Sequence, residues 1–180
     1  MQLRICRHGG KNVLLIAALA ALTACSSTPQ RQQLSQANSC KASTDQAQQV
    51  KLDLVEQLLS EGSYYSALAH LEQGGQQSPR RSWLSAEAQR KTGLLSDAYQ
   101  QYRELSLGCM AAAGHAGMAK ILATRGDLAS AHQHMLKARQ LAPTNADIRN
   151  DYGFILLATG DFKAAQREFM TAMQLRKDHP

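Results

Sequence analysis

The sequence predicts an all-α fold built from about four consecutive helical hairpins. Two observations support this prediction: the composition and an internal repeat. Apolar residues make up 44% of the 180 residues, but aromatic residues only 5%. Ala, Leu and Gln are abundant, which suits helices packed through small and aliphatic side chains, whereas sheets favour β-branched and aromatic residues. No segment of any length shows the alternating pattern of a strand.

Residues 1–24 have the pattern of a removable signal peptide. Basic residues precede a continuous apolar run over residues 13–22 (VLLIAALAAL). This run is well short of the ~20 residues that a membrane-spanning helix needs, so a cleaved signal is favoured. Residues 22–25 then read LTAC and end at Cys25.

The LTAC segment resembles the bacterial lipobox, in which an apolar residue and two small residues precede the modified cysteine. The resemblance implies cleavage before Cys25 and acylation of this residue, with three acyl chains that would hold the protein firmly in a membrane. By the same resemblance, Ser26 favours the outer membrane, with the protein facing the periplasm. The alternative is an ordinary signal peptide that ends near a cysteine.

The remaining chain divides into a tether and a folded domain. Residues 25–43 begin with the lipidated cysteine and continue as a polar, Gln/Ser-rich stretch without periodicity, which predicts a flexible tether of ~25 Å. Residues 44–180 form the predicted repeat domain. Three of the 20 basic residues lie in the signal peptide, which leaves 17 against 14 acidic residues. The basic residues do not cluster, so we expect no nucleic-acid partner.

A period of 34 residues governs the C-terminal part of the chain. Such a period indicates stacked helical hairpins. Six residues recur unchanged: Leu122, Gly126, Asp127, Ala131, Ala138 and Leu141 are matched by Leu156, Gly160, Asp161, Ala165, Ala172 and Leu175.

Each position of the repeat has a physical role in a helical hairpin. Gly126 can adopt the left-handed conformation that ends a helix, and Asp127 can cap the start of the next. Ala131 is small enough for the second helix to approach the first, and Met135 fills the space one turn further on. Pro143 stands where the hairpin should stop.

The same pattern appears twice upstream, with Gly62 and Gly93 as the turn glycines. Together with Gly126 and Gly160 they are spaced by 31, 33 and 34 residues. We therefore predict four hairpins, near 48–77, 79–108, 112–144 and 146–178. Ser43-Thr44-Asp45 is the predicted start of the first helix.

This pattern resembles the tetratricopeptide repeat over about 130 residues. The third and fourth repeats carry the family's small residue at the eighth position (Ala119 and Gly153). The first two depart from the pattern, since Gly74 and Leu105 stand where an alanine belongs. The resemblance implies a right-handed superhelical stack. The alternative is an amphipathic helical bundle without superhelical stacking.

In such a stack the first helix of each hairpin lines a concave, protein-binding face. Carrying the family's groove positions over gives a list of expected contact residues: Arg80, Trp83, Glu87, Arg90, Lys91, Lys120, Thr124, Asp147, Asn150, Phe154 and Leu157. Trp83, the only Trp, is the candidate anchor, since Trp and Arg most often carry interface energy. Alternatively, Trp83 packs between the first two repeats and the nearby basic residues form a solvated face.

The sequence contains no motif that is typical of catalysis, cofactor binding or metal binding. It contains no nucleophile elbow, phosphate loop, zinc-protease motif or Cys pair at metal spacing. His132 and His134 are two residues apart, so on a helix they point about 200° from each other and cannot share a metal. We expect both to be solvated. The chain is therefore not expected to be an enzyme.

Two cysteines remain once Cys6 leaves with the signal peptide and Cys25 is lipidated. Cys40 and Cys109 would share an oxidising compartment, in which a disulfide is chemically permitted. A bond would attach the tether to the solenoid, but the sequence does not show whether the two residues come close enough. The alternative is a pair of free thiols.

A short lipid-anchored repeat protein resembles the TadD-type lipoproteins of the tight adherence (Flp) pilus system. The segment at 150–154 (NDYGF) is also similar to the N-x-Y-G element of type IV pilotin lipoproteins. These resemblances imply a scaffold or assembly factor for a pilus or secretion apparatus, with a secretin or pilus component as the protein partner. The alternative is a periplasmic adaptor for cell-envelope enzymes or outer-membrane biogenesis. An enzyme or a nucleic-acid binder is the least favoured hypothesis.

Overall fold

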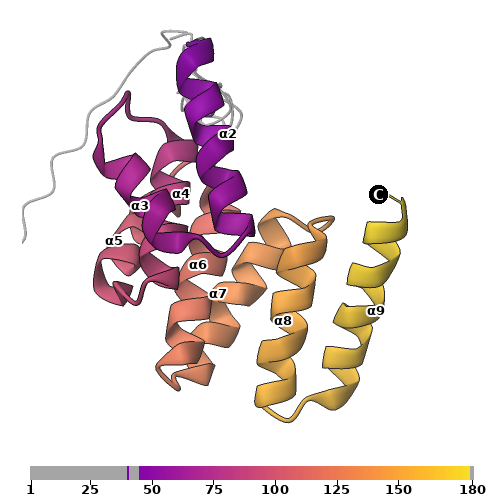
Figure 1. The fold of residues 1–180 in the computed structure, drawn as a ribbon. Coiled ribbons are helices and arrows are strands. Elements are labelled where there is room, and N and C mark those ends of the chain that lie inside the picture. Colours follow the sequence, from indigo (N-terminus) through magenta and orange to yellow (C-terminus); the bar gives the residue numbers. More distant parts are fainter. Residues whose placement is uncertain (1–39, 41–44, 179–180) are drawn as a thin grey trace, which may run out of the picture.

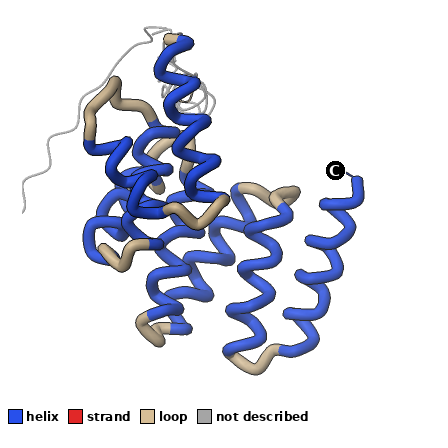
Figure 2. Tube along the Cα trace, viewed as in Figure 1, coloured by secondary structure: helices blue, strands red, loops and turns tan. Residues whose placement is uncertain are grey.

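The computed structural model describes Cys40 and residues 45–178; the predicted signal peptide, the lipidation site Cys25 and most of the tether lie outside these residues. The described part consists of helices joined by short loops and contains no strand (Figure 2). Its helices are α2 (Gln46–Ser60), α3 (Tyr64–Glu72), α4 (Pro79–Lys91), α5 (Leu95–Leu105), α6 (Ala111–Thr124), α7 (Leu128–Leu141), α8 (Ala146–Ala158) and α9 (Phe162–Asp178). The all-α prediction is confirmed.

The helices pair into four hairpins that follow one another along the stack (Figure 1). The main helix contacts join partners within one hairpin or in neighbouring hairpins, such as α5 with α6 and α7 with α8. The apolar core accordingly consists of three successive clusters along the stack. The described helices do not pack around a single central core, as the helices of a bundle would. Each hairpin is stabilised by its neighbours, as in a solenoid.

Four glycines turn the chain between the two helices of each hairpin. Gly62, Gly93, Gly126 and Gly160 have φ values from 82° to 87°. L-residues with a Cβ rarely adopt this region, so glycine is required there. The predicted role of the turn glycines is confirmed in all four repeats.

Side-chain caps begin several helices where the sequence predicted them. The Asp45 carboxylate accepts hydrogen bonds from the backbone of Ala47 and Gln48, at 3.0 and 3.4 Å. Asp127 and Asp161 cap α7 and α9 in the same way, at 3.1 and 3.0 Å. These bonds satisfy backbone N–H groups that have no partner within the helix.

The first repeat departs from the others at its second helix. α3 has nine residues, against 17 in α9. Gly74, which stands at the position of the family's second alanine, has a φ of 87° and lies in the loop after α3. In the second repeat, Leu105 fills the equivalent position and is the last residue of α5.

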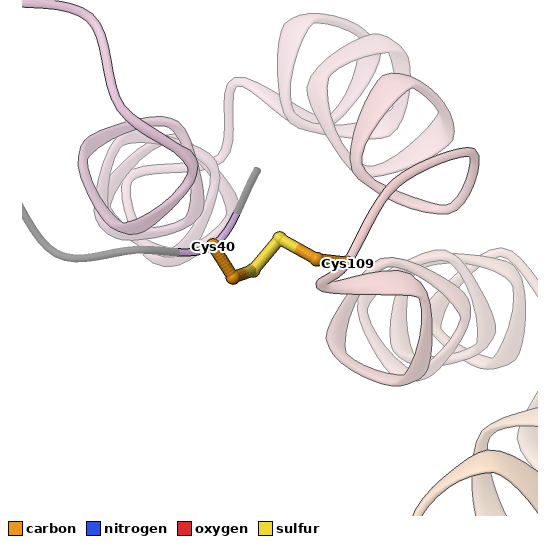
Figure 3. Close-up of a disulfide and its surroundings, with 2 residues drawn as sticks. All are labelled: Cys40 and Cys109. Carbon is orange, nitrogen blue, oxygen red and sulfur yellow. A yellow bond between two sulfur atoms is a disulfide. The ribbon is translucent and has the colours of Figure 1, made fainter. Parts of the chain in front are cut away.

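A disulfide joins Cys40 to Cys109, with 5.6 Å between their Cα atoms (Figure 3). Cys109 lies in the connector between α5 and α6, near the middle of the repeat domain. The pairing that the sequence left open is therefore present in the structure. Within the described range, none of the helices combines the length and hydropathy needed to cross a membrane.

Candidate functional site

The candidate site is a cavity of about 480 Å³ lined mainly by the first helices of the four hairpins. α2, α4, α6 and α8 all contribute, so the cavity runs along the face that the repeat pattern predicts to be concave. Its walls combine the aromatic side chains of Trp83 and Tyr64 with charged groups of both signs. A partner would meet a mixed aromatic and charged surface, which is typical of protein-binding interfaces.

The sequence left two roles open for Trp83, a binding residue of the groove or a core residue between the first two repeats, and the structure combines them. It packs against the core cluster of the first repeat and α4, and also against the cluster formed by α4, α5 and α6. At the same time it lines the cavity. Its ring therefore connects the core to the candidate binding surface.

A network of charged groups surrounds Glu87 of α4, which lines the cavity. Its carboxylate accepts hydrogen bonds from Arg90 at 2.6 Å and from the Tyr102 hydroxyl at 2.6 Å. Lys120 of α6 lies 3.2 Å from the same carboxylate and 3.9 Å from that of Asp151 on α8. The network therefore joins the second, third and fourth repeats.

This network holds Glu87 in its charged form. Burial disfavours the charge, but attraction to Lys120 and Arg90 and hydrogen bonds from Tyr102 and Arg90 outweigh it. Together they lower the pKa of Glu87 from 4.5 to about 2. Burial, and then the neighbouring Glu87 charge, raise the pKa of Tyr102 above its usual value. Burial also raises the pKa of Asp151, against the attraction of Lys120.

Acid is expected to destabilise the domain through Glu87. Because its pKa is lower in the folded state, its contribution is fully present above about pH 4.5 and is lost as the pH falls towards about 2. The expected loss in the free energy of unfolding is roughly 3 kcal/mol. Urea unfolding of the wild type and Glu87→Gln across this range measures it. The variant should show the shallower pH dependence, and parallel pH profiles would contradict the assignment.

The structure brings five of the expected groove residues to the cavity and places the others elsewhere. The five that line it are Trp83, Glu87, Lys91, Lys120 and Asp147. Lys91 also lies over the Tyr64 ring, 5.3 Å from its centroid. Sequence reasoning missed several lining residues: Glu56, Tyr64, Met110, Asn145, Ile148 and Asp151. Tyr64 follows a turn glycine and belongs to a second helix, which the repeat pattern assigns to the opposite face.

The other expected groove residues do not line the cavity. Arg80 pairs with Asp53, at 2.7 Å, and with Glu56. Arg90 is held by Glu87, and its side chain is only 17% exposed. The remaining four are Thr124, Asn150, Phe154 and Leu157. The groove predicted from the repeat pattern is thus longer than the cavity.

The expected solvated histidines make specific contacts instead. His132 lies 3.0 Å from the Tyr152 hydroxyl, and His134 lies 3.0 Å from His115 between their Nδ1 atoms. Both are half-buried, which corrects the prediction that they are solvated. Burial lowers the pKa of His115 and of His134. Among the residues that the structure describes, no group of three or more His, Cys, Asp or Glu side chains is placed to hold a metal.

The stack of hairpins with a cavity along its first helices defines the class: a helical-repeat, solenoid protein. Residues 122–180 match the tetratricopeptide-repeat family. The last third of the chain therefore carries the tetratricopeptide repeat that its sequence pattern indicated. Repeats of this kind act as scaffolds for protein–protein interaction.

The chain is similar to a TPR repeat-containing protein, PA4299, of Pseudomonas aeruginosa. The two sequences are 32% identical over 142 residues, which cover 77% of this chain and 56% of the relative. This chain therefore spans a little over half the length of that relative.

Two solved structures show the same fold. One is TTC0263, a thermophilic TPR protein of Thermus thermophilus, with a TM-score of 0.64 and 22% identity, covering 72% of this chain and 74% of that one. The other is MamA, with a TM-score of 0.54 and 13% identity, covering 72% of this chain and 78% of that one.

Proposed function

We propose that this chain is an outer-membrane lipoprotein that acts as a scaffold or assembly factor for a pilus or secretion apparatus. Cys25 carries the lipid, residues 26–43 form the tether, and the repeat domain faces the periplasm. The partner is a secretin or another pilus-assembly component. The observation that carries the proposal is the aromatic and charged cavity along the first helices, joined in one sequence to an LTAC segment that resembles a lipobox.

The disulfide adds a constraint on how the anchor would hold the domain. Because Cys40 is bonded to Cys109, the lipid end is attached at the connector between α5 and α6 as well as at α2. Cys40 lies 15 positions after Cys25, so the segment between them reaches ~50 Å at most when fully extended. The anchor would therefore keep the connector between α5 and α6 within ~50 Å of the membrane.

Replacing Cys25 with Ser is expected to remove the protein from the membrane fraction. Serine has no thiol to take up the diacylglyceryl group, and no described helix could replace the lipid as an anchor. Membrane fractionation followed by immunoblotting measures the distribution. Retention of the variant at the wild-type level would contradict the lipoprotein assignment.

The cavity itself is tested by Lys91→Glu. Lys91 is exposed and lines the cavity, so reversing its charge should leave the melting temperature nearly unchanged. It should weaken capture of a co-expressed secretin about tenfold or more, because reversing a charge within a binding surface disrupts its electrostatic match with the partner. Trp83 and Arg90 are less suitable, since their truncation would also disturb the core and the Glu87 network.

Lys163→Glu is the matched control for this experiment. Lys163 is exposed on α9 and does not line the cavity, but it undergoes the same chemical change. Equal loss of secretin capture in both variants would contradict a role for the cavity. Recovery of a peptidoglycan synthase in place of a secretin would favour an adaptor of cell-envelope enzymes instead.

A further inference from the structure

Two histidines connect the helices of the third hairpin. His115 of α6 and His134 of α7 are half-buried, and their Nδ1 atoms lie 3.0 Å apart. The centroids of the two rings are 5.3 Å apart. This is close to the largest separation that such an Nδ1–Nδ1 distance allows, so each Nδ1 atom points directly at the other. The contact is therefore a hydrogen bond and not a stacking of the two rings.

This geometry fits one shared proton and leaves no room for a metal ion between the rings. In a neutral pair, the Nδ1–H group of one imidazole donates to the free Nδ1 of the other. A metal ion would need a distance of about 2.0–2.1 Å from each imidazole nitrogen, with the two nitrogens converging on it. Two nitrogens that face each other across 3.0 Å cannot provide these distances.

The hydrogen bond between the two histidines requires at least one neutral ring. A singly protonated pair can keep the bond, because the imidazolium donates to the imidazole that still has a free Nδ1. The second proton removes this last acceptor and leaves two N–H donors facing each other. It also places two positive charges at contact distance in a half-buried position, where water screens them less than at the surface.

No acidic neighbour in the described part of the chain compensates for these charges. Burial is the main cause that lowers the pKa of His115, followed by the charges of His134 and of Lys137, which lies on α7 one turn after His134. Burial alone lowers the pKa of His134. The helices α4, α5 and α8, which also pack against this hairpin, contribute no charged group to either shift. The folded hairpin therefore favours the neutral pair.

A second histidine contact on α7 provides an internal comparison. The Nε2 atom of His132 lies 3.0 Å from the Tyr152 hydroxyl of α8. A hydroxyl both donates and accepts, so this hydrogen bond survives protonation of the imidazole by reversing its direction. The bond between two histidines has no such alternative. Acid should therefore weaken the contact of α7 with α6 and spare its contact with α8.

We infer that His115 and His134 form an acid-sensitive latch, which holds α6 against α7 at neutral pH and opens the third hairpin when both rings are protonated. Because folding lowers both pKa values, the stabilisation is fully present above about pH 6.5, the ordinary pKa of histidine, and is lost as the pH falls below it. The loss through Glu87 begins only below about pH 4.5. α6 also contributes to the cavity wall, so opening of this hairpin alters the cavity whichever partner it binds.

The test compares the wild type with the double variant His115→Asn, His134→Asn. The asparagine amide takes the place of the Nδ1 atom, donates and accepts hydrogen bonds, and does not titrate. Amide hydrogen exchange, corrected for its intrinsic pH dependence, gives the opening equilibrium of each helix between about pH 7.5 and about pH 5. In the wild type, opening of α6 and α7 should increase about tenfold, the usual worth of one buried hydrogen bond. α2 and α3 should not respond, and the double variant should lose the response.

His132→Gln is the matched control, because it removes one imidazole from the same helix and keeps a hydrogen-bond partner for Tyr152. It should respond to acid like the wild type. An equal response in the double variant, or loss of the response in His132→Gln, would overturn the inference. If the double variant does not fold, nitrogen NMR of the imidazole rings in the wild type decides the question. Loss of amide protection in α6 and α7 in step with the second protonation supports the latch, and protonation of both His115 and His134 without this loss overturns it.

Discussion

Replacing Cys40 and Cys109 together with Ser is expected to lower the free energy of unfolding of the first two repeats by about 4 kcal/mol. The disulfide closes a segment of 69 residues. In the chain-entropy description, a closed loop of this length removes about that much conformational freedom from the unfolded state. The segment contains α2 to α5 and none of the later helices. The loss should therefore be unevenly distributed along the stack.

Amide hydrogen exchange combined with urea unfolding measures both the size and the place of this effect. Protection should fall in α2 to α5 and change little in α8 and α9, because solenoid stability is close to a sum over neighbouring repeats. The wild type under reducing conditions is the matched control and should behave like the double variant. A uniform loss over all eight described helices, or no loss at all, would contradict a local role for the disulfide.

The sequence predicted the helices and their turns because these features depend on short-range interactions. The glycine between two helices, such as Gly126, adopts its positive φ for reasons of local sterics. Asp127 caps the next helix through a backbone N–H three residues away. Repetition of these local patterns at 34 residues then defined the hairpins, and the stack followed from the need to bury their apolar faces.

The candidate site was only partly predictable because its residues meet across different helices. Glu87 is separated from Lys120 by 33 residues and from Tyr102 by 15. Nothing in the local pattern around Glu87 indicates these partners. For the same reason, Arg90 was assigned to the groove, whereas the structure holds it against Glu87. A repeat pattern predicts the helix face on which a residue lies, but it does not predict which neighbouring side chain forms an ion pair or hydrogen bond with it.

Two close helix contacts were missed for a similar reason. The repeat pattern requires a small residue at its eighth position, and Ala119 and Gly153 fulfil this. Gly114 and Gly117 lie outside that position but are both buried in α6. A Cβ on Gly117 would overlap the Tyr102 ring, and one on Gly114 would meet the α5 backbone. These glycines allow α5 and α6 to approach closely, which only the three-dimensional contact reveals.

Gly114→Ala is therefore expected to destabilise the domain, although alanine is the better helix former. The added Cβ would lie 2.5 Å from the backbone nitrogen of Ser106 and 2.6 Å from the carbonyl oxygen of Tyr102. Backbone atoms cannot turn aside as a flexible side chain does, so α5 and α6 must separate and loosen their packing. Overpacking of this kind outweighs the gain of about 1 kcal/mol in helix propensity. We expect a net loss of about 2–3 kcal/mol and a melting temperature lower by about 5–10 °C.

Gly108→Ala provides the matched control for this effect. A Cβ on Gly108 would have its nearest neighbour at 3.9 Å, an ordinary van der Waals contact. The same chemical change should therefore leave the melting temperature unchanged or slightly raised, because alanine restricts the unfolded chain. Thermal unfolding followed by circular dichroism compares the two variants. Gly114→Ala melting at or above the wild-type temperature would contradict this argument. The close approach of α6 to α5 would then not depend on the missing side chain at position 114, and the packing between the second and third repeats would tolerate a wider separation.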